Sequence, residues 1–256
     1  MDLSFKGRAK RIDDIDLPRI GAQIGVGEDE LHAFMDVEAA GSGFDSQGRP
    51  KMLFEPHVFY RNLKGEKRDR AVREGLAYAK WRRNYPADSY PRLRAAIAID
   101  EAAALKASSW GAGQILGENY AAAGYTSPQE MVTAFIDDEE NHVQAMVNFL
   151  KSKGLAKKLR EHDWAGVARG YNGAGYKANA YDRKMADAFA KWKKIRDTAW
   201  VPGDPPSAKP VEPVKPVPAP PPSPEGQTPP AAKPEPKRGI WTIIFEIIGR
   251  ILKGGR

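Results

Sequence analysis

The sequence predicts a mainly α-helical domain that contains a small β-hairpin, followed by a proline-rich linker and a short amphipathic helix. Three observations lead to this fold class. Apolar residues recur at three- and four-residue spacing through most of residues 1–200, which is typical of amphipathic helices. Residues 41–54 break that spacing with several glycines and an Arg-Pro step. Residues 205–236 contain 14 prolines in 32 positions.

The helical spacing predicts helices over residues 16–25, 28–38, 67–80, 91–106, 128–153, 163–171 and 178–199. The helix that begins at Pro128 has a good start, because a serine precedes the proline and Glu130 places an acid in the first turn. The glycines and Arg49-Pro50 of the interruption predict turns around one short hairpin.

The composition excludes several kinds of site. The chain has no cysteine, so disulfide bonds and thiolate metal sites are impossible. The histidines, at positions 32, 57, 142 and 162, lack metal-ligand spacing, and we predict neither a metal nor another cofactor. The net charge of +7 suits an anionic polymer or membrane surface, but no nucleic-acid-binding motif accompanies it. We therefore expect no nucleic-acid partner, and we expect a monomer.

An acidic run lies inside the helix predicted over residues 128–153, at Asp137-Asp138-Glu139-Glu140. We interpret it as a solvated helix face near an N-terminus, where the helix dipole favours negative charge. His142 follows this run without any metal-ligand spacing. Neither feature is assigned a functional role.

The proline-rich stretch defines the domain boundaries. Proline fixes φ and removes a hydrogen-bond donor, so residues 201–238 are predicted to be a disordered, extended and semi-stiff linker. This linker separates a domain at residues 1–200 from a C-terminal segment at residues 239–256. A docking role for a proline-reading partner is the alternative to a simple linker.

The C-terminal segment reads as an amphipathic helix. In Ile240–Leu252 the polar residues fall on one helical face, apolar residues cover the rest, and basic residues flank both ends. Thirteen helical residues extend about 20 Å, against a bilayer core of about 30 Å. We therefore expect this helix to lie on an anionic membrane or lipopolysaccharide surface, or in a partner's groove, rather than to span a bilayer. Docking on its own domain is the alternative.

Glu38 is the candidate for acid chemistry. It ends the predicted helix 28–38 and shares a face with Leu31, Phe34 and Met35. Burial and the negative end of the helix dipole both raise a carboxyl pKa, and a carboxyl that stays protonated near neutral pH can act as a general acid. From this helix alone, a buried carboxylate paired with an arginine is the better interpretation. Three sequence blocks reverse that preference.

These blocks occur in order along the chain. They are Val37-Glu38-Ala39-Ala40-Gly41, Ser108-Ser109-Trp110-Gly111-Ala112-Gly113-Gln114-Ile115 and Ala168-Arg169-Gly170-Tyr171-Asn172-Gly173-Ala174-Gly175. Together they resemble conserved blocks of the lysozyme superfamily, especially goose-type lysozymes and soluble lytic transglycosylases. The resemblance implies a lysozyme-like helical domain whose catalytic acid is Glu38.

A closer resemblance is to the N-acetylmuramidase family of phage endolysins. Its early signature is similar to Glu38, Gly41, Gly43-Phe44, Gly48-Arg49-Pro50 and Leu53-Phe54-Glu55-Pro56-His57. The resemblance covers roughly residues 10–198 and excludes the linker and tail. It implies cleavage of the glycosidic bond between N-acetylmuramic acid and N-acetylglucosamine in bacterial peptidoglycan, for which a general acid must protonate the leaving oxygen.

The resemblance also implies roles for individual residues. Gln114 would hydrogen-bond a sugar or its N-acetyl group. Tyr171 would contribute its ring and hydroxyl to the cleft, and Asn172 would orient the backbone there. Trp110, expected at the start of a helix, would either stack on a sugar or fill the core.

The second carboxylate has two candidates. Asp45 lies in the predicted hairpin, where some lysozymes keep an acid. Glu55 matches the family block and would hold a water or a neighbouring base, or else cap the helix that begins near Pro56. If neither carboxylate activates water, the substrate's own hydroxyl can attack and give an anhydro product, as in lytic transglycosylases.

The sequence therefore predicts an endolysin-type peptidoglycan hydrolase. The alternatives are a lytic transglycosylase of the same fold, a non-enzymatic peptidoglycan-binding virion protein and a membrane-lytic toxin. The N-terminus lacks the apolar run of a secretory signal, and no stretch of about 18 apolar residues occurs. We expect the protein to stay in the host cytoplasm until another protein releases it to the cell wall.

Overall fold

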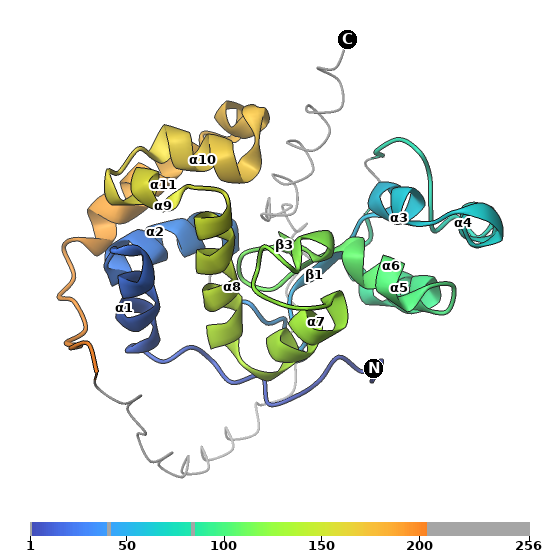
Figure 1. The fold of residues 1–256 in the computed structure, drawn as a ribbon, viewed down its shortest axis with the longest axis horizontal. Helices are drawn as coiled ribbons and strands as arrows, with labels where there is room; N and C mark the ends of the chain where they lie inside the picture. Colours follow the sequence, from blue (N-terminus) through green and yellow to red (C-terminus); the bar gives the residue numbers. More distant parts are fainter. Residues whose placement is uncertain (1, 40–41, 83–84, 204–256) are drawn as a thin grey trace, which may run out of the picture.

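The computed structural model describes residues 2–39, 42–82 and 85–203 (Figure 1). The helices in these ranges are α1 (Asp16–Gly21), α2 (Glu28–Ala39), α3 (Pro56–Asn62), α4 (Gly65–Arg73), α5 (Tyr90–Ile97), α6 (Glu101–Lys106), α7 (Pro128–Asp137), α8 (Glu139–Ser152), α9 (Ala156–Arg160), α10 (Trp164–Asn172) and α11 (Tyr181–Trp192). Short 3-10 helices lie at η1 (Ala22–Ile24), η2 (Gly117–Asn119) and η3 (Ala174–Asn179). The mainly helical class is confirmed. None of the helices in the described ranges is long and apolar enough to cross a bilayer.

The predicted short hairpin is present as one antiparallel bridge, and it is accompanied by a three-stranded antiparallel sheet that the sequence did not predict. Its strands are β1 (Met52–Phe54), β2 (Ser108–Trp110) and β3 (Ile115–Leu116), in the order β1-β2-β3. The predicted turn exists, because Phe44 and Pro50 form an antiparallel bridge. However, β1 pairs with β2, far along the chain, with Met52 opposite Trp110. The sequence pattern did not indicate β2 and β3, because strands of two or three residues are too short to show a periodicity and depend on the strands they pair with.

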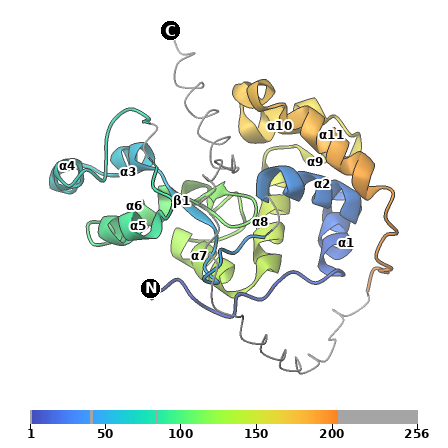
Figure 2. The same cartoon turned by 180° about the vertical axis from the view of Figure 1, so that it is seen from behind.

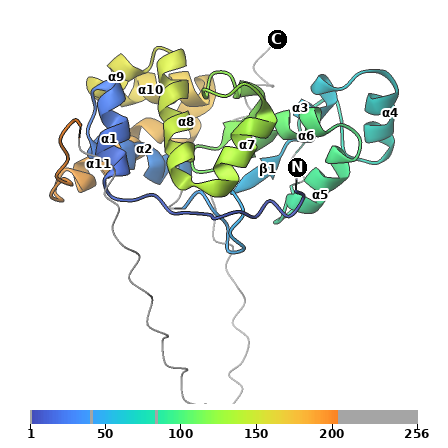
Figure 3. The ribbon, with the colours of Figure 1, turned by 60° about the horizontal axis from the view of Figure 1, so that its bottom comes forward.

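The helices form two groups on either side of this sheet. Figures 1 and 2 show α3, α4, α5 and α6 on one side, and α1, α2, α9, α10 and α11 on the other. Helices α7 and α8 lie between the two groups, as a third direction of view confirms (Figure 3). Helix α2 packs along α11, and α10 also packs on α11. The C-terminal ends of α2 and α10 therefore belong to the same group of helices.

Two of the predicted helices are broken. The helix predicted over 128–153 divides at Asp138, whose extended backbone lets its side chain accept a hydrogen bond from Glu140 N at 2.9 Å. Asp138 also pairs with Lys10 of the N-terminal segment. The helix predicted over 91–106 divides at Asp100, which caps α6 by accepting from Ala103 N at 2.9 Å. Each aspartate terminates the helix because it offers the backbone an alternative hydrogen bond. Helix α4 likewise ends before residue 80.

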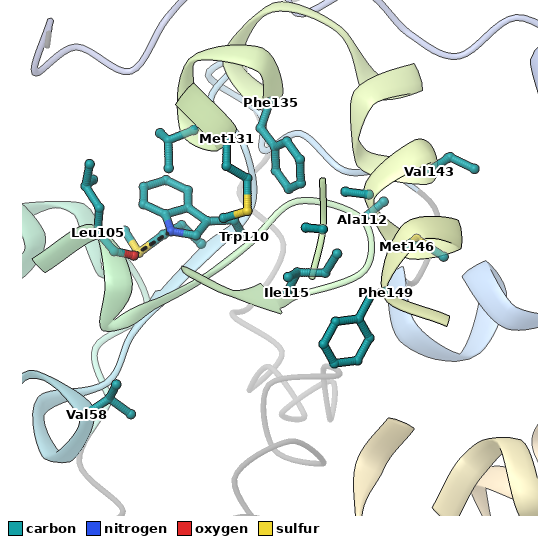
Figure 4. Close-up of a cluster of buried hydrophobic side chains, with 14 of the residues drawn as sticks. Val58, Leu105, Trp110, Ala112, Ile115, Met131, Phe135, Val143, Met146 and Phe149 are labelled. Carbon is teal, nitrogen blue, oxygen red and sulfur yellow. Dashed lines mark hydrogen bonds between the residues drawn. The ribbon is translucent and has the colours of Figure 1, made fainter. Parts of the chain in front are cut away.

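Trp110 lies in the core of the sheet and not at the start of a helix. Its side chain is fully buried, and its Nε1 donates to Leu105 O at 3.1 Å. Figure 4 shows the indole beside Met131 and Phe135, with the hydrogen bond dashed. Of the two roles predicted for Trp110, the structure therefore supports core packing.

The remaining expectations concern the C-terminal part of the chain. The linker predicted over 201–238 and the amphipathic helix predicted over 239–256 lie outside the described residues, apart from residues 201–203. Both stay predictions from the sequence.

Candidate active site

Glu38 lies in the last turn of α2, and only 3% of its surface is exposed. Leu31 and Phe34, on the same face, are fully buried, so the helix packs this face into the core. Burial raises the pKa of the Glu38 carboxyl to about 7, because a charge there loses its hydration. Asn172 Nδ2 donates to Glu38 Oε1 at 2.8 Å and opposes that rise. No arginine is among its described partners, so the predicted alternative of a structural ion pair is not supported.

Tyr171, on α10, contacts both α2, which carries Glu38, and the loop that follows β2. Its hydroxyl donates to Gly113 O at 2.9 Å, and its ring meets Phe34 and Phe149 edge-on, with centroids 4.7 and 5.3 Å apart. The pKa of Tyr171 is raised well above its usual value, first by burial and then by the nearby Glu38 carboxyl. The phenol is therefore neutral at any working pH. Its hydroxyl, which we expected to face the substrate, is bound to the backbone of the loop.

Gln114 occupies a strained position in the same loop. Its φ of 48° is left-handed, which is rare for a residue other than glycine. Its Nε2 donates to Gly111 O at 2.8 Å and to Lys51 O at 3.3 Å. Its Oε1 is buried and has no hydrogen-bond partner within the described part of the chain. Backbone strain and an unpaired buried acceptor are both features of binding sites, so Gln114 stays a candidate for sugar recognition.

The structure thus brings four of the predicted residues together. Asn172 binds Glu38, Tyr171 binds Gly113, and Gln114 follows Gly113 directly. These contacts join α2, α10 and the loop between β2 and β3, which are widely separated in the sequence.

Asp45 belongs to a different cluster. Its Oδ1 accepts from Gln47 N at 2.8 Å and from Arg49 N at 3.0 Å, and its Oδ2 accepts from Arg49 Nε at 2.7 Å. Arg49 in turn lies over the Tyr90 ring, 4.0 Å from its centroid. Both oxygens of Asp45 are therefore engaged in holding the turn before β1, and the structure does not bring Asp45 to the Glu38 cluster.

Glu55 forms a second buried carboxyl site, directly after β1. Only 2% of its surface is exposed, and burial raises its pKa to about 7. Ser109 Oγ donates to its Oε1 at 3.0 Å, while His57 Nε2 lies 3.7 Å from its Oε2. Burial lowers the pKa of His57 to about 4, so the imidazole is neutral. The Glu55 side chain makes no capping bond to α3, which excludes the capping role.

The sheet register separates this second site from the first. Gln114 contacts Lys51 at one end of β1, and Glu55 follows the other end. Four residues of extended strand cover roughly 13 Å. Within the described residues, the hydrogen-bonding partners of Glu38 and Glu55 are also different residues. The structure therefore places the two carboxyls in separate clusters.

Two polar residues near the start of α8 are fully buried. Glu139 belongs to the acidic run, so the predicted solvated helix face is wrong at that position, and His142, which follows the run, is buried as well. A signal was present, because His142 lies four and seven residues before Met146 and Phe149, which are apolar. Because Glu139 is charged and His142 is polar, the sequence did not show that the buried face of α8 extends to both residues.

The N-acetylmuramidase family matches residues 28–193, which is more than half of the chain. The chain belongs to this family. The domain is also similar to the crystal structure of the Burkholderia AP3 phage endolysin, with 34% sequence identity and a TM-score of 0.67 over 73% of each chain. None of the curated proteins matches the chain. The muramidase match and the endolysin likeness confirm the resemblance seen in the sequence and identify a peptidoglycan-cleaving enzyme.

The electrostatics of this muramidase site predict how Glu38 responds to a change at Asn172. The Asn172 amide stabilises the charged carboxylate by donating to it, so Asn172→Ala should move the pKa of Glu38 further above about 7. Titration of the labelled Glu38 carboxyl by NMR measures this change. Asn62→Ala, which removes an amide donor on α3, is the control and should leave the pKa of Glu38 unchanged. A fall in the pKa of Glu38 in the Asn172 variant would contradict the assigned hydrogen bond.

Proposed function

We propose that this protein cleaves the bond between N-acetylmuramic acid and N-acetylglucosamine in peptidoglycan, with Glu38 as the general acid. The observation that supports this proposal most strongly is the buried Glu38 carboxyl, whose pKa of about 7 keeps much of it protonated at neutral pH. Membership of the N-acetylmuramidase family supports the choice of bond. Similarity to a phage endolysin supports peptidoglycan in the bacterial wall as the target.

The hydrogen bond from Asn172 determines which oxygen of Glu38 carries the proton. Because Asn172 Nδ2 donates to Oε1, that oxygen acts as the acceptor and the proton resides on Oε2. Transfer of this proton to the glycosidic oxygen lets the sugar leave as a neutral alcohol rather than as an alkoxide. Above pH 7 the carboxyl loses its proton, so the rate of bond cleavage should fall as the pH rises through that value.

Gln114 is suited to orient the sugar. Its amide nitrogen is already engaged by two backbone carbonyls, which leaves Oε1 as the atom able to make a new bond. A buried acceptor of this kind pairs with an N–H or O–H donor, and an N-acetyl sugar offers both. The hydrogen bonds to Gly111 O and Lys51 O hold the amide in place before substrate arrives.

The attacking nucleophile has two candidate sources. In hydrolysis, a carboxylate activates water, and Glu55 is the better candidate because Asp45 is engaged by Arg49. In a lytic transglycosylase reaction, a hydroxyl of the substrate attacks and leaves an anhydro end. Because Glu55 and Glu38 lie in separate clusters, the arrangement favours this second route.

The role of Glu38 as an acid predicts the behaviour of Glu38→Gln. Glutamine has the same shape and no proton of the required acidity, so the fold should persist while lysis falls by about 10²–10⁴-fold. Clearing of purified cell walls, together with thermal unfolding, measures both effects. Glu74→Gln, an exposed substitution on the other group of helices, is the matched control. Wild-type clearing by the Glu38 variant would rule out this mechanism.

The nucleophile is identified by combining a variant with product analysis. If Glu55 activates water, Glu55→Gln should lower turnover at least about 10²-fold, as expected for loss of a general base, and wild-type products should carry reducing ends. Asp45→Asn serves as the comparison. If neither variant changes the rate more than a few-fold and mass spectrometry finds anhydro ends, the enzyme is a lytic transglycosylase.

We also propose that residues 239–256 bind an anionic membrane or lipopolysaccharide surface, and that the protein stays in the host cytoplasm until it is released to the wall. The support is the sequence alone. A broad apolar face lies between basic ends, beyond a linker that allows it to act independently of the domain.

Truncation after Trp200 tests the membrane role. Hydrolysis of lipid-free sacculi should be almost unchanged, whereas binding to vesicles of anionic lipid should fall, since each basic residue near the surface contributes about 1 kcal/mol. Ile247→Asp in the full-length chain keeps the linker but places a charge on the apolar face, and it should weaken vesicle binding as well. Raised salt should weaken vesicle binding by the wild type. Loss of activity on bare sacculi after truncation would show that the tail acts on the wall instead.

A further inference from the structure

His142 is a buried polar residue that the proposed chemistry leaves without a role. It lies in the first turns of α8, fully enclosed. Ala112 N donates to its Nδ1 at 3.2 Å, and its Nε2 lies 2.8 Å from Phe135 O. A carbonyl can only accept and an amide N–H can only donate, so the ring is neutral and carries its proton on Nε2. Each ring nitrogen therefore has a fixed and different task.

Two loops close on this ring at glycines. A Cβ added at Gly43 would lie 2.2 Å from His142 Nδ1, and one added at Gly111 would lie 2.8 Å from the same atom. Phe44 and Phe135 pack on the ring, with centroids 5.1 and 4.4 Å away. Glycine is therefore required at both positions for the loops to reach the imidazole. One loop follows the acid helix α2, and the other leads to Gln114.

Glu139, one turn earlier on α8, holds the same region from a second side. Its carboxylate accepts from Gly43 N, from Arg11 Nε at 2.6 Å and from Ile12 N at 3.3 Å. Figure 3 shows the N-terminal segment, in blue, passing along the start of α8. The start of α8 thus binds both the N-terminal segment and the loop at Gly43. Because these segments are held in place, we expect a change at the imidazole to displace the loops that contact it.

A short series of bonds connects His142 with the acid. The ring holds Ala112 N, and the next residue, Gly113, accepts from the Tyr171 hydroxyl. Asn172 follows Tyr171 and donates to Glu38 Oε1. Three hydrogen bonds, joined by neighbouring residues of the chain, therefore run from the buried imidazole to the carboxyl. The same loop carries Gln114 one residue further on.

We propose that His142 is a positioning residue, which holds the Gly111–Gln114 loop so that Tyr171 and Asn172 are set against Glu38. The inference rests on the proposed function of Glu38 as the acid. An apolar side chain of similar size would leave Ala112 N and Phe135 O buried and unpaired, which is unfavourable, and it would release the loop. The bond to Nδ1 positions the acid, whereas the bond from Nε2 stabilises the contact between α7 and α8.

Two substitutions separate these bonds. His142→Asn keeps an acceptor at the position of Nδ1 and loses the donor to Phe135 O. His142→Gln keeps a donor at the position of Nε2 and loses the acceptor for Ala112 N. Both should destabilise the domain, so a merely structural role would affect them alike. We expect only His142→Gln to raise the pKa of Glu38, measured by NMR titration, and to lower kcat by about 10- to 10²-fold, as expected for a small displacement of a catalytic group.

Tyr171→Phe provides a second measurement if His142→Gln fails to fold. It breaks the same series of bonds at Gly113 O without touching the imidazole, and it should also raise the pKa of Glu38. The NMR titration needs no catalysis, so it tests the positioning role even if peptidoglycan is not cleaved. Failure of the wild type to clear sacculi would instead count against the proposed function. An unchanged Glu38 titration in both His142→Gln and Tyr171→Phe, or equal kcat losses in the two His142 variants, would overturn the proposal.

Discussion

The pairing of β1 with β2 is the interaction on which the rest of this structure depends. It joins residues 52–54 to residues 108–110, so two distant parts of the chain are fixed in register. With the strands in this register, Gln114 Nε2 reaches Lys51 O at the end of β1, and the Trp110 side chain is buried in the core. The helices of both groups pack around this sheet, whose loop between β2 and β3 carries Gln114 (Figures 1 and 4).

Burial gives this fold its chemistry. Two buried carboxyls, Glu38 and Glu55, both have pKa values raised to about 7, and in each case the loss of hydration outweighs the hydrogen bond that favours the charge. Exposed carboxyls of the same chain serve in surface ion pairs, as Glu74 does with Arg70. The difference lies in the environment and not in the residue type. The apolar face of α2 therefore packs the helix into the core and, by burying the Glu38 carboxyl, helps it to keep its proton near neutral pH.

The sequence by itself determined the helical class, the burial of the Glu38 carboxyl and the family. The spacing of Leu31, Phe34 and Glu38 places the carboxyl on the buried face, since residues three and four apart share one side of a helix. Gln114 and Asn172 were identified through the sequence blocks that carry the family resemblance. The helical class and the family are confirmed, because each depends on local spacing or on short contiguous motifs, which the chain specifies before it folds.

Only the tertiary structure decided the partners of these residues. The sequence could not show that Trp110 fills the core or that Arg49 forms an ion pair with Asp45. Nor could it show that the single helix predicted over 128–153 divides at Asp138, with Glu139 buried. Each outcome is set by groups that are distant in the sequence, such as Lys10 beside Asp138 and Leu105 O beside the indole. Hydrophobic periodicity reports which face of an element is buried. It carries no information on which distant backbone donor or acceptor a polar side chain will meet, because that depends on how the elements pack.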